Sequence, residues 1–409
     1  MLPLIVFLLL LFAYSLFSRR VENSFLTAPM LFTAAGMVLF PLLPAIRSAG
    51  MNPSIFLHTA EIGLVLLLFT DASRTDFRVL CRIRSLPARL LTIGMLLTIA
   101  LGAVAAKLVF PNLSIWEAGI LGAILAPTDA GLGQVIVSSV RVPLRIRQAL
   151  NVEAGLNDGL AVPFMLFFIT LADAKVEGSI TSLTLFIRDQ LGLGVLVGLT
   201  VGLLAGWLLG LARRKGWMAD SFLQIGVVAI PLVCMGISEL VNASMFIAAF
   251  LAGLAVQAGF KEAGKHSIEF AEEWGQFFNL AVFFLFGMAV VRYHSHFNWS
   301  DVIYAVLSLT VVRMLPVAAA LAGTGLNRAT VWFMGWFGPR GLASIVLGVV
   351  YFEQQTKLPG EDTIMIAAIV TVMLSIFVHG FTAVPGIGLY SREIAALDTD
   401  APERQASAA

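Results

Sequence analysis

Apolar runs follow one another along the whole chain, and this pattern restricts the fold more than any other feature. Of the 409 residues, 59% are hydrophobic and only 12% are charged. Soluble globular proteins carry about 25% charged residues, so the composition excludes a water-soluble fold. Backbone polar groups cannot stay unpaired in lipid, and apolar runs of this length therefore predict transmembrane helices. We expect an all-α polytopic membrane protein.

Charged or Pro/Gly-containing breaks divide the apolar sequence into about thirteen predicted spans. These spans lie near residues 2–17, 27–45, 55–72, 86–110, 115–139, 147–172, 183–211, 219–238, 243–259, 275–291, 300–323, 329–351 and 362–389. The fifth, seventh and last spans are long enough to be tilted or broken. The first run lacks a basic leader and a small-residue cleavage site, so we expect it to be retained as a helix. The residues after Tyr390 are polar and Ala-rich, and we expect them to be disordered.

Basic residues are distributed unevenly between the predicted loops. Most of the 26 Lys and Arg residues fall in loops after odd-numbered spans or in the C-terminal tail. Cytoplasmic loops carry such an excess. We therefore predict a multi-pass protein of the cell membrane (plasma or inner) with its N-terminus outside and its C-terminus in the cytoplasm. The net charge of +1 gives no indication of nucleic-acid binding.

Two motifs place a proline and a charged residue in the middle of apolar spans. They are Ala126-Pro127-Thr128-Asp129 in the fifth span and Gly338-Pro339-Arg340-Gly341 in the twelfth. Proline removes a helix hydrogen bond, and matched interruptions in two halves of a chain indicate a transporter's central site. The alternative is a pair of ordinary proline kinks. The predicted organisation is two inverted six-helix repeats at about 1–172 and 219–390, joined by a linker helix at 183–211. A short cytoplasmic tail follows at 391–409.

Three spans carry charged side chains to a similar depth. Counting about 1.5 Å per residue from the flanking charged positions places Asp129, Asp158 and Arg340 near the bilayer midplane. Glu153 lies somewhat closer to the cytoplasm. An ionised side chain at the bilayer centre costs roughly 2.5–3.5 kcal/mol. We therefore expect these side chains to meet and to form an ion site.

Roles for these side chains follow from their chemistry. Glu153 and Asn157 are four residues apart and share one helix face. Arg340 stays ionised, so we predict that it pairs with Glu153 in a structural clamp that an Asn157 hydrogen bond supports. Asp158 then keeps no permanent cationic partner. One carboxylate that is exposed alternately to each side can carry either H⁺ or a monovalent cation, which is sufficient for exchange.

Three further polar residues lie within apolar spans. Asp71, near the cytoplasmic end of the third span, is expected to line the inner entrance or to join the cation's ligands; the alternative is a pair with Arg74 on the same helix. Arg313 is expected to reach the membrane surface or to bind a backbone carbonyl. His379 is expected to be a packed polar residue rather than a proton relay.

With these residues the membrane region resembles the monovalent cation:proton antiporters of the sodium/proton exchanger type, in the branch with an Asn-Asp pair. The resemblance rests on Phe69-x-Asp71, Pro127-Thr128-Asp129, Glu153 through Asp158 and Gly338-Pro339-Arg340-Gly341. It implies a thirteen-helix inverted-repeat fold in which the unwound centres of the fifth and twelfth helices cross. It also implies a homodimer in which a dimerisation domain and a mobile core domain move relative to each other.

The resemblance also implies site residues. An asparagine beside the ion-binding aspartate implies electroneutral exchange. The chain departs from the family at Ala154, where many relatives carry a serine whose hydroxyl can bind the ion. The resemblance assigns the ion-binding aspartate and the other cation ligands to Asp158, Asp129, Thr128 and Asp71, and a buried ion-pair network to Glu153, Arg340 and Asn157.

The expected function is secondary active antiport rather than enzymatic catalysis. We predict that Na⁺ (or Li⁺) is exchanged for H⁺ by alternating access in support of pH homeostasis, with no cofactor besides the transported ions. K⁺/H⁺ exchange on the same scaffold is the alternative, because oxygen ligands serve both ions. An ion channel is a weaker alternative, because the sequence shows neither a continuous polar path nor a ring of like residues for a selectivity filter. An organic-anion carrier is weaker too, since the central carboxylates outnumber Arg340. The expected partners are a monovalent cation, a proton, membrane lipid and a second copy of the chain.

Overall fold

The computed structural model describes residues 2–22, 24–43, 53–74, 86–173, 188, 192–260, 265–353, 358–397 and 401–403. Within these ranges the regular elements are all helices. The first part of the chain contains α1 (Leu2–Glu22), α2 (Ala28–Leu42), α4 (Pro53–Arg74), α6 (Leu86–Arg89), the π-helical turn η1 (Leu90–Gly94), α7 (Met95–Val109), α8 (Ile115–Ile124), α9 (Ala130–Ser138) and α10 (Leu144–Ala172).

The remaining helices form the second part of the fold. They are α12 (Leu193–Arg214), α13 (Asp220–Leu240), α14 (Met245–Gly259), α15 (Lys265–Tyr293), the 3₁₀ turn η4 (His294–His296), α16 (Trp299–Leu309), α17 (Val311–Ala320), α18 (Arg328–Trp336), α19 (Leu342–Glu353) and α20 (Glu361–Ala395). Among the described residues, nine helices are long and apolar enough to cross a membrane, and four shorter apolar helices accompany them. The prediction of an all-α polytopic membrane protein is confirmed, while the count of thirteen spans stays a prediction.

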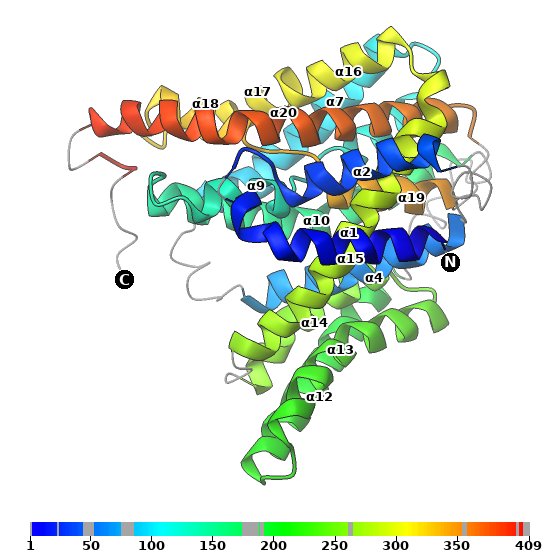
Figure 1. Cartoon of the computed structure of the whole chain (residues 1–409), viewed down its shortest axis with the longest axis vertical. Coiled ribbons are helices and arrows are strands. Elements are labelled where there is room, and N and C mark those ends of the chain that lie inside the picture. Colours follow the sequence, from blue (N-terminus) through cyan, green and yellow to red (C-terminus); the bar gives the residue numbers. More distant parts are fainter. Residues whose placement is uncertain are drawn as a thin grey trace.

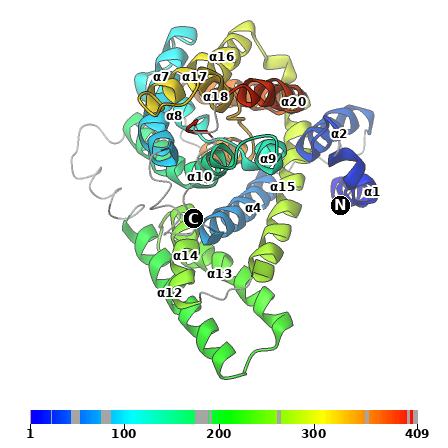
Figure 2. The same cartoon turned by 90° about the vertical axis from the view of Figure 1, so that its left-hand side faces the viewer.

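The helices pack as two groups that meet in the middle of the molecule (Figures 1 and 2). We call α6 to α10 with α16 to α20 the crossover bundle, and α1, α2, α4 and α12 to α15 the scaffold bundle. In the scaffold bundle, α15 packs along α2 and α4, and α14 packs along α4 and α12. In the crossover bundle, α8 lies between α7 and α10, and α20 contacts α16, α18 and α19. The bundles meet mainly where α4 contacts α10 and α19.

A row of glycines explains the close packing of α12 on α14. Gly198, Gly202 and Gly206 repeat at four-residue spacing, so they lie on one face of α12. A side chain at Gly198 or Gly202 would collide with the backbone of Ala248 or Ala252 on α14. Small residues at such spacing allow helix backbones to approach closely in membranes, where apolar side chains gain little by leaving lipid. This contact stabilises the scaffold bundle without charged groups.

The two predicted proline interruptions are confirmed as breaks. Residues 125–129 separate α8 from α9, and residues 337–341 separate α18 from α19. A third break was not predicted: the eleventh span is interrupted at Thr310, where φ is −108° and ψ is −90°. Thr310 is neither proline nor glycine, so composition gave no signal for it. The break starts the new helix α17, and Arg313 lies in its first turn.

The C-terminal tail differs from the prediction. The last helix continues beyond Tyr390 to Ala395, and Glu403 is buried. The Glu403 carboxylate accepts hydrogen bonds from the Asn327 backbone N–H at 2.6 Å and from the Thr330 hydroxyl at 3.0 Å. The tail therefore is not disordered throughout, because one acidic residue binds the N-terminus of α18. Residues 398–400 and 404–409, and most of the predicted linker-helix start at 183–191, lie outside the described residues.

Candidate ion site at the crossed helix breaks

The break in the fifth span starts with Pro127. Proline has no backbone N–H to donate and disfavours helical backbone at the residue before it. The helix α8 accordingly ends at Ile124, and the chain is non-helical until Asp129, which is the N-cap of α9. The Asp129 Oδ1 atom accepts a hydrogen bond from the Leu132 backbone N–H at 2.9 Å, as N-cap aspartates do.

Asp129 also binds the second break. Its Oδ2 atom accepts a hydrogen bond from the Leu342 backbone N–H, which is at the start of α19. Its own backbone N–H donates to the Pro339 carbonyl at 2.7 Å. Helix N-termini carry partial positive charge, so one carboxylate stabilises the N-termini of both α9 and α19. The two unwound segments therefore cross in direct contact.

The two glycines of the Gly-Pro-Arg-Gly motif admit charged neighbours. A side chain at Gly338 would collide with the guanidinium of Arg313, and one at Gly341 would collide with the carboxylate of Asp129. Each position therefore requires glycine, because a charged group lies directly against the backbone. The break in the twelfth span is accordingly positioned between a cation from α17 and an anion from the fifth span.

Arg340 is fully buried, but its partner differs from the prediction. Its Nη1 atom donates to the carbonyls of Ala126 and Pro127, at 2.8 and 3.1 Å. These carbonyls follow the C-terminus of α8, where partial negative charge favours a cation. The predicted direct ion pair with Glu153 is not formed, because the guanidinium instead binds carbonyls that the broken helix leaves without intrahelical partners, and Glu153 interacts with it only electrostatically.

Glu153 on α10 pairs with Arg313, the arginine that we expected at the membrane surface or on a carbonyl. The Arg313 Nη1 and Glu153 Oε1 atoms are 2.6 Å apart, and both side chains are 3% exposed. A cation in the first turn of a helix opposes the helix dipole, and a nearby carboxylate offsets this. The position of Arg313 in the middle of an apolar span was the signal for a buried ion pair.

Asn157 is also placed differently from the prediction. Its Nδ2 atom donates to the Thr128 hydroxyl at 2.7 Å, so it connects α10 to the unwound segment 125–129 rather than to Glu153. Its Oδ1 atom is buried and accepts no hydrogen bond from the described residues. The amide therefore holds Thr128 next to α10 and leaves one oxygen free for a ligand.

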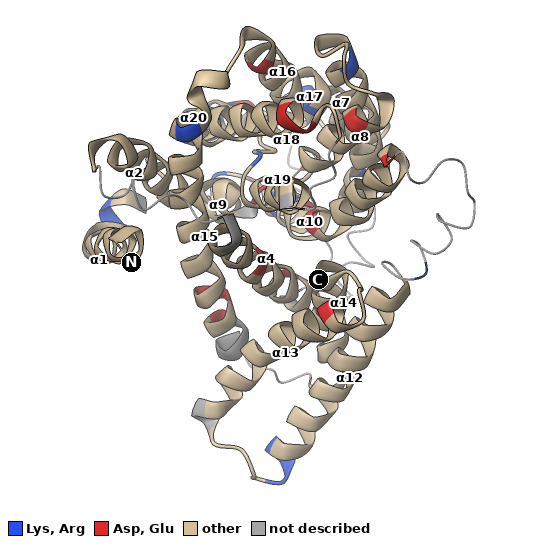
Figure 3. Ribbon diagram, turned by 90° about the vertical axis from the view of Figure 1, so that its right-hand side faces the viewer, with Lys and Arg blue, Asp and Glu red and all other residues tan. Residues whose placement is uncertain are grey.

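Asp158 follows directly on α10 and is 4% exposed. Its Oδ1 atom is buried and has no hydrogen-bond partner in the described part of the chain. Asp129 and Asp71 are close enough to interact with it electrostatically. The Asp71 side chain, from α4 of the scaffold bundle, lies against Gly155 of α10. Figure 3 shows acidic positions on α4 and α10 in the interior of an otherwise mostly uncharged ribbon.

The structure thus brings the predicted ligands Asp158, Asp129, Thr128 and Asp71 to one region. Across the described residues, no group of three or more His, Cys, Asp and Glu side chains is arranged to hold a metal ion. An ion bound at Asp158 would therefore not be held by carboxylates alone, and hydroxyl, amide or water oxygens would complete its ligands. The alternative partner of Asp71, the side chain of Arg74, lies outside what the structure describes.

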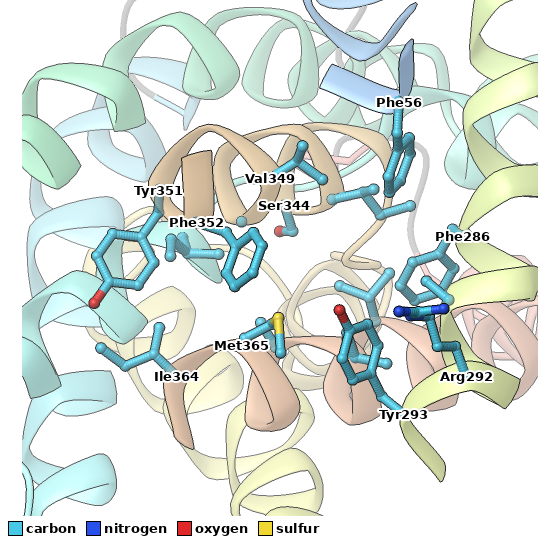
Figure 4. Close-up of a pocket in the computed structure, with 17 residues that line it drawn as sticks. Phe56, Phe286, Arg292, Tyr293, Ser344, Val349, Tyr351, Phe352, Ile364 and Met365 are labelled. Carbon is cyan, nitrogen blue, oxygen red and sulfur yellow. The ribbon is translucent and has the colours of Figure 1, made fainter. Parts of the chain in front are cut away.

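A separate cavity of about 110 Å³ lies where the two bundles meet, lined by residues of α4, α8, α15, α19 and α20 (Figure 4). Its walls are mostly apolar, with Phe56, Phe286 and Met365 among them, and Arg292 and Tyr293 stand at one edge. Among the described residues, no acidic side chain lines it. The cavity is therefore distinct from the carboxylate region around Asp158.

Two discontinuous helices that cross beside a buried carboxylate define a class of secondary membrane transporters. The family model described as "Sodium/hydrogen exchanger, transmembrane" matches residues 6–386, and the chain belongs to this family of cation/proton antiporters. The sodium proton antiporter MjNhaP1 from Methanocaldococcus jannaschii superposes with a TM-score of 0.72 at 21% identity, covering 93% of this chain and 99% of that one. This likeness confirms the predicted all-α antiporter fold, and the crossing of the two discontinuous helices is seen in the contacts of this structure itself.

Curated relatives carry two kinds of name. An "Na(+)/H(+) antiporter" from Schizosaccharomyces pombe is 26% identical over 67% of this chain and 64% of the relative. The "K(+)/H(+) antiporter NhaP" from Alkalimonas amylolytica is 25% identical over 82% of this chain and 57% of the relative. The chain thus spans less than two thirds of the length of these relatives.

Proposed function

We propose that this chain is a secondary antiporter that exchanges Na⁺ (or Li⁺) for H⁺ by alternating access. The observation that supports the proposal most is Asp158, a buried carboxylate with one oxygen that has no hydrogen-bond partner among the described residues. A buried charge without a partner is costly, so this side chain gains free energy by binding either a proton or a cation. Binding one excludes the other, and this competition couples the two fluxes.

The roles of the neighbouring residues follow from their contacts. Thr128, Asn157 and Asp129 lie at the crossing and offer oxygen ligands around Asp158. Asp71 belongs to the scaffold bundle, whereas Asp158 belongs to the crossover bundle. In the proposed cycle the crossover bundle moves against the scaffold bundle, so Asp158 is exposed to one side of the membrane at a time. Glu153 and Arg313 keep the moving bundle intact and carry no ion.

The proposal is tested in proteoliposomes that contain a pH-sensitive dye. Addition of Na⁺ is expected to dissipate an imposed pH gradient with the wild-type chain but not with Asp158→Asn. The matched control is Asp301→Asn, which makes the same change at a buried carboxylate that only caps α16. Exchange by Asp158→Asn at the wild-type rate would remove Asp158 from the mechanism.

Potassium is the second candidate ion, because a matched relative bears the name of a K⁺/H⁺ antiporter. The same vesicles distinguish the two ions when Na⁺, Li⁺ and K⁺ are added separately. We expect Na⁺ and Li⁺ to be active at lower concentration than K⁺. The reverse order would replace the sodium proposal with potassium exchange and leave the role of Asp158 unchanged.

We further propose that exchange is electroneutral. Asp158 is the carboxylate that binds both ions, and its neighbour Asn157 is neutral and engaged with Thr128. One proton then returns for each cation, and no net charge crosses the membrane. A potential of 100 mV changes the free energy by about 2.3 kcal/mol per net charge moved. Exchange rates should therefore be insensitive to an imposed potential, and a clear dependence would contradict one-for-one exchange.

The proposal includes the arrangement of the protein in the membrane. We propose a homodimer in the cell membrane with an external N-terminus, a cytoplasmic C-terminus and inverted repeats at about 1–172 and 219–390. The breaks at 125–129 and 337–341, one in each half, support the repeats. Labelling of single cysteines at the ends of α1 and α20 in intact cells tests the orientation, and cross-linking in membranes tests the dimer.

A further inference from the structure

The two breaks create four helix ends inside the protein, and each needs a partner for its unsatisfied backbone groups. Asp129 binds the N-termini of α9 and α19, and Arg340 binds carbonyls that follow the C-terminus of α8. The fourth end is the C-terminus of α18, which finishes at Trp336. The Trp336 carbonyl accepts from the Gly338 backbone N–H at 2.9 Å, and its second contact is a histidine of α20 to which the proposed transport mechanism assigns no role.

Ser375 and His379 are four residues apart on α20 and therefore share one face. Both are buried, with exposures of 0% and 2%. The His379 Nε2 atom lies 2.9 Å from the Trp336 carbonyl oxygen. The Arg340 backbone N–H donates to the Ser375 hydroxyl at 2.6 Å. The pair thus contacts the last residue of α18 and the broken segment 337–341 itself.

Both ring nitrogens of His379 lie next to backbone carbonyls. Nε2 is 2.9 Å from the Trp336 carbonyl oxygen, and Nδ1 is 3.0 Å from the Ser375 carbonyl oxygen and 3.2 Å from the Ser375 hydroxyl. The hydroxyl accepts from the Arg340 N–H, so its own hydrogen is available for Nδ1 of a ring that carries its hydrogen on Nε2 and donates it to Trp336. The other neutral form would donate from Nδ1 to the Ser375 carbonyl and leave Trp336 without this donor, and a doubly protonated ring would add a charge near Arg340 and Arg313.

We propose that His379, together with Ser375, is a positioning residue for the ion site. The pair holds the unwound segment 337–341 in place through hydrogen bonds from α20. In this position the Pro339 carbonyl accepts from the Asp129 backbone N–H, and the Leu342 backbone N–H donates to the Asp129 carboxylate. This fixes the crossing segment that carries Thr128 toward Asp158. His379 itself touches no ion. The transport test of this role rests on the proposed antiport, whereas the structural test rests only on the hydrogen bonds.

The transport test compares two substitutions at one position. Glutamine places an amide N–H close to the position of Nε2, so His379→Gln keeps the donor to the Trp336 carbonyl, whereas His379→Ala removes it. Loss of a supporting hydrogen bond around an ion site raises the ion concentration needed by roughly 10-fold or more. We expect His379→Ala to raise KM for the cation roughly 10-fold with little change in kcat, and His379→Gln to restore most of the wild-type KM.

Ser375 provides an independent pair of variants. Ser375→Ala removes the acceptor for the Arg340 N–H, and Ser375→Thr retains the hydroxyl. We expect the alanine variant to raise KM and the threonine variant to resemble wild type. An unchanged KM in His379→Ala, or a glutamine variant as impaired as the alanine variant, would overturn the proposal.

The structural test does not depend on transport. In NMR spectra of protein with ¹⁵N-labelled histidine, we expect a signal from an imidazole that carries its hydrogen on Nε2. This signal should be lost in His379→Gln, which identifies it as His379. A hydrogen on Nδ1 of that ring would overturn the assignment. If wild-type protein exchanges no cation while this signal is present, the proposed antiport fails and the hydrogen-bond assignment stands. If exchange occurs and the signal is absent, the positioning role fails alone.

Discussion

Glu153 and Asp158 are five residues apart on the same helix and are almost equally buried, at 2% and 4% exposure, yet their surroundings differ. Glu153 is held by the Arg313 guanidinium at 2.6 Å. Asp158 has an oxygen with no hydrogen-bond partner among the described residues and has two other carboxylates in its vicinity. The comparison teaches that the partner, rather than burial, separates an acid that is neutralised within the fold from one whose oxygen is left for a proton or a cation.

The largest effect on stability is expected from Arg313→Ala. The substitution leaves the Glu153 carboxylate buried without its cation, and breaking such a pair costs about 3–5 kcal/mol. Thermal unfolding in detergent, together with folded yield, measures the loss. Asp158→Asn is the matched comparison, and we expect its melting temperature to stay near wild type because no ion pair is broken. Equal destabilisation by the two variants would contradict the difference between the two acids.

A double substitution sharpens the same comparison. Replacing a buried ion pair with apolar residues of similar size is often neutral for stability. Arg313→Met combined with Glu153→Leu is therefore expected to recover most of the stability that Arg313→Met loses alone. The coupling between the two sites follows from the four unfolding free energies of the double-mutant cycle. Additive losses would show that the two side chains do not stabilise each other.

A smaller loss is expected at Arg340, because its bonded partners are carbonyl groups rather than a carboxylate. Arg340→Met removes the donors to the Ala126 and Pro127 carbonyls. Hydrogen bonds that involve a charged group contribute about 1.5–3 kcal/mol, so the free energy of unfolding should fall by an amount in that range. The decrease is measured by thermal unfolding beside Arg313→Ala. A loss as large as that of Arg313→Ala would mean that Arg340 shares the ion pair.

The control for this prediction is Arg89→Met. Arg89 also donates to two backbone carbonyls, those of Ala320 and Ala322, but it lies at a partly exposed position. Water can replace its hydrogen bonds, so we expect a smaller change than for Arg340→Met. Equal changes at the two arginines would show that burial adds nothing to these contacts.

The fold could be predicted from the sequence because apolar length and proline position act locally. The breaks at Pro127 and Pro339 follow from a missing backbone N–H, whatever the rest of the chain does. The break at Thr310 could not be predicted in this way, because threonine leaves the helix possible and tertiary packing decides. The order in the tail was missed for the same reason, since Glu403 is held by a distant helix N-terminus.

The sequence could predict that these polar side chains come together, but not how they pair. Counting residues along a span gives the depth of a side chain but not its direction around the bundle. Arg313 and Arg340 lie at similar depth, and Glu153 could have paired with either. The closer approach of Arg313 depends on Gly338, whose missing side chain admits the guanidinium. Such a contact between the eleventh and twelfth spans is a property of packing and has no signal in residue spacing.

The smallest effect is expected at Ala154, which lies one helical turn before Asp158 and on the same face of α10. Ala154→Ser adds a hydroxyl oxygen that can serve as a further ligand, and one hydrogen-bond-sized contact of 0.5–1.5 kcal/mol corresponds to a roughly 2- to 10-fold change in KM. We expect KM for Na⁺ to fall within this range in the vesicle assay. The control is Ala149→Ser, which adds a hydroxyl on another face of α10 within an apolar cluster. If both serine variants left KM unchanged, the ion would not contact residue 154. Ion binding on α10 would then depend on Asp158 alone.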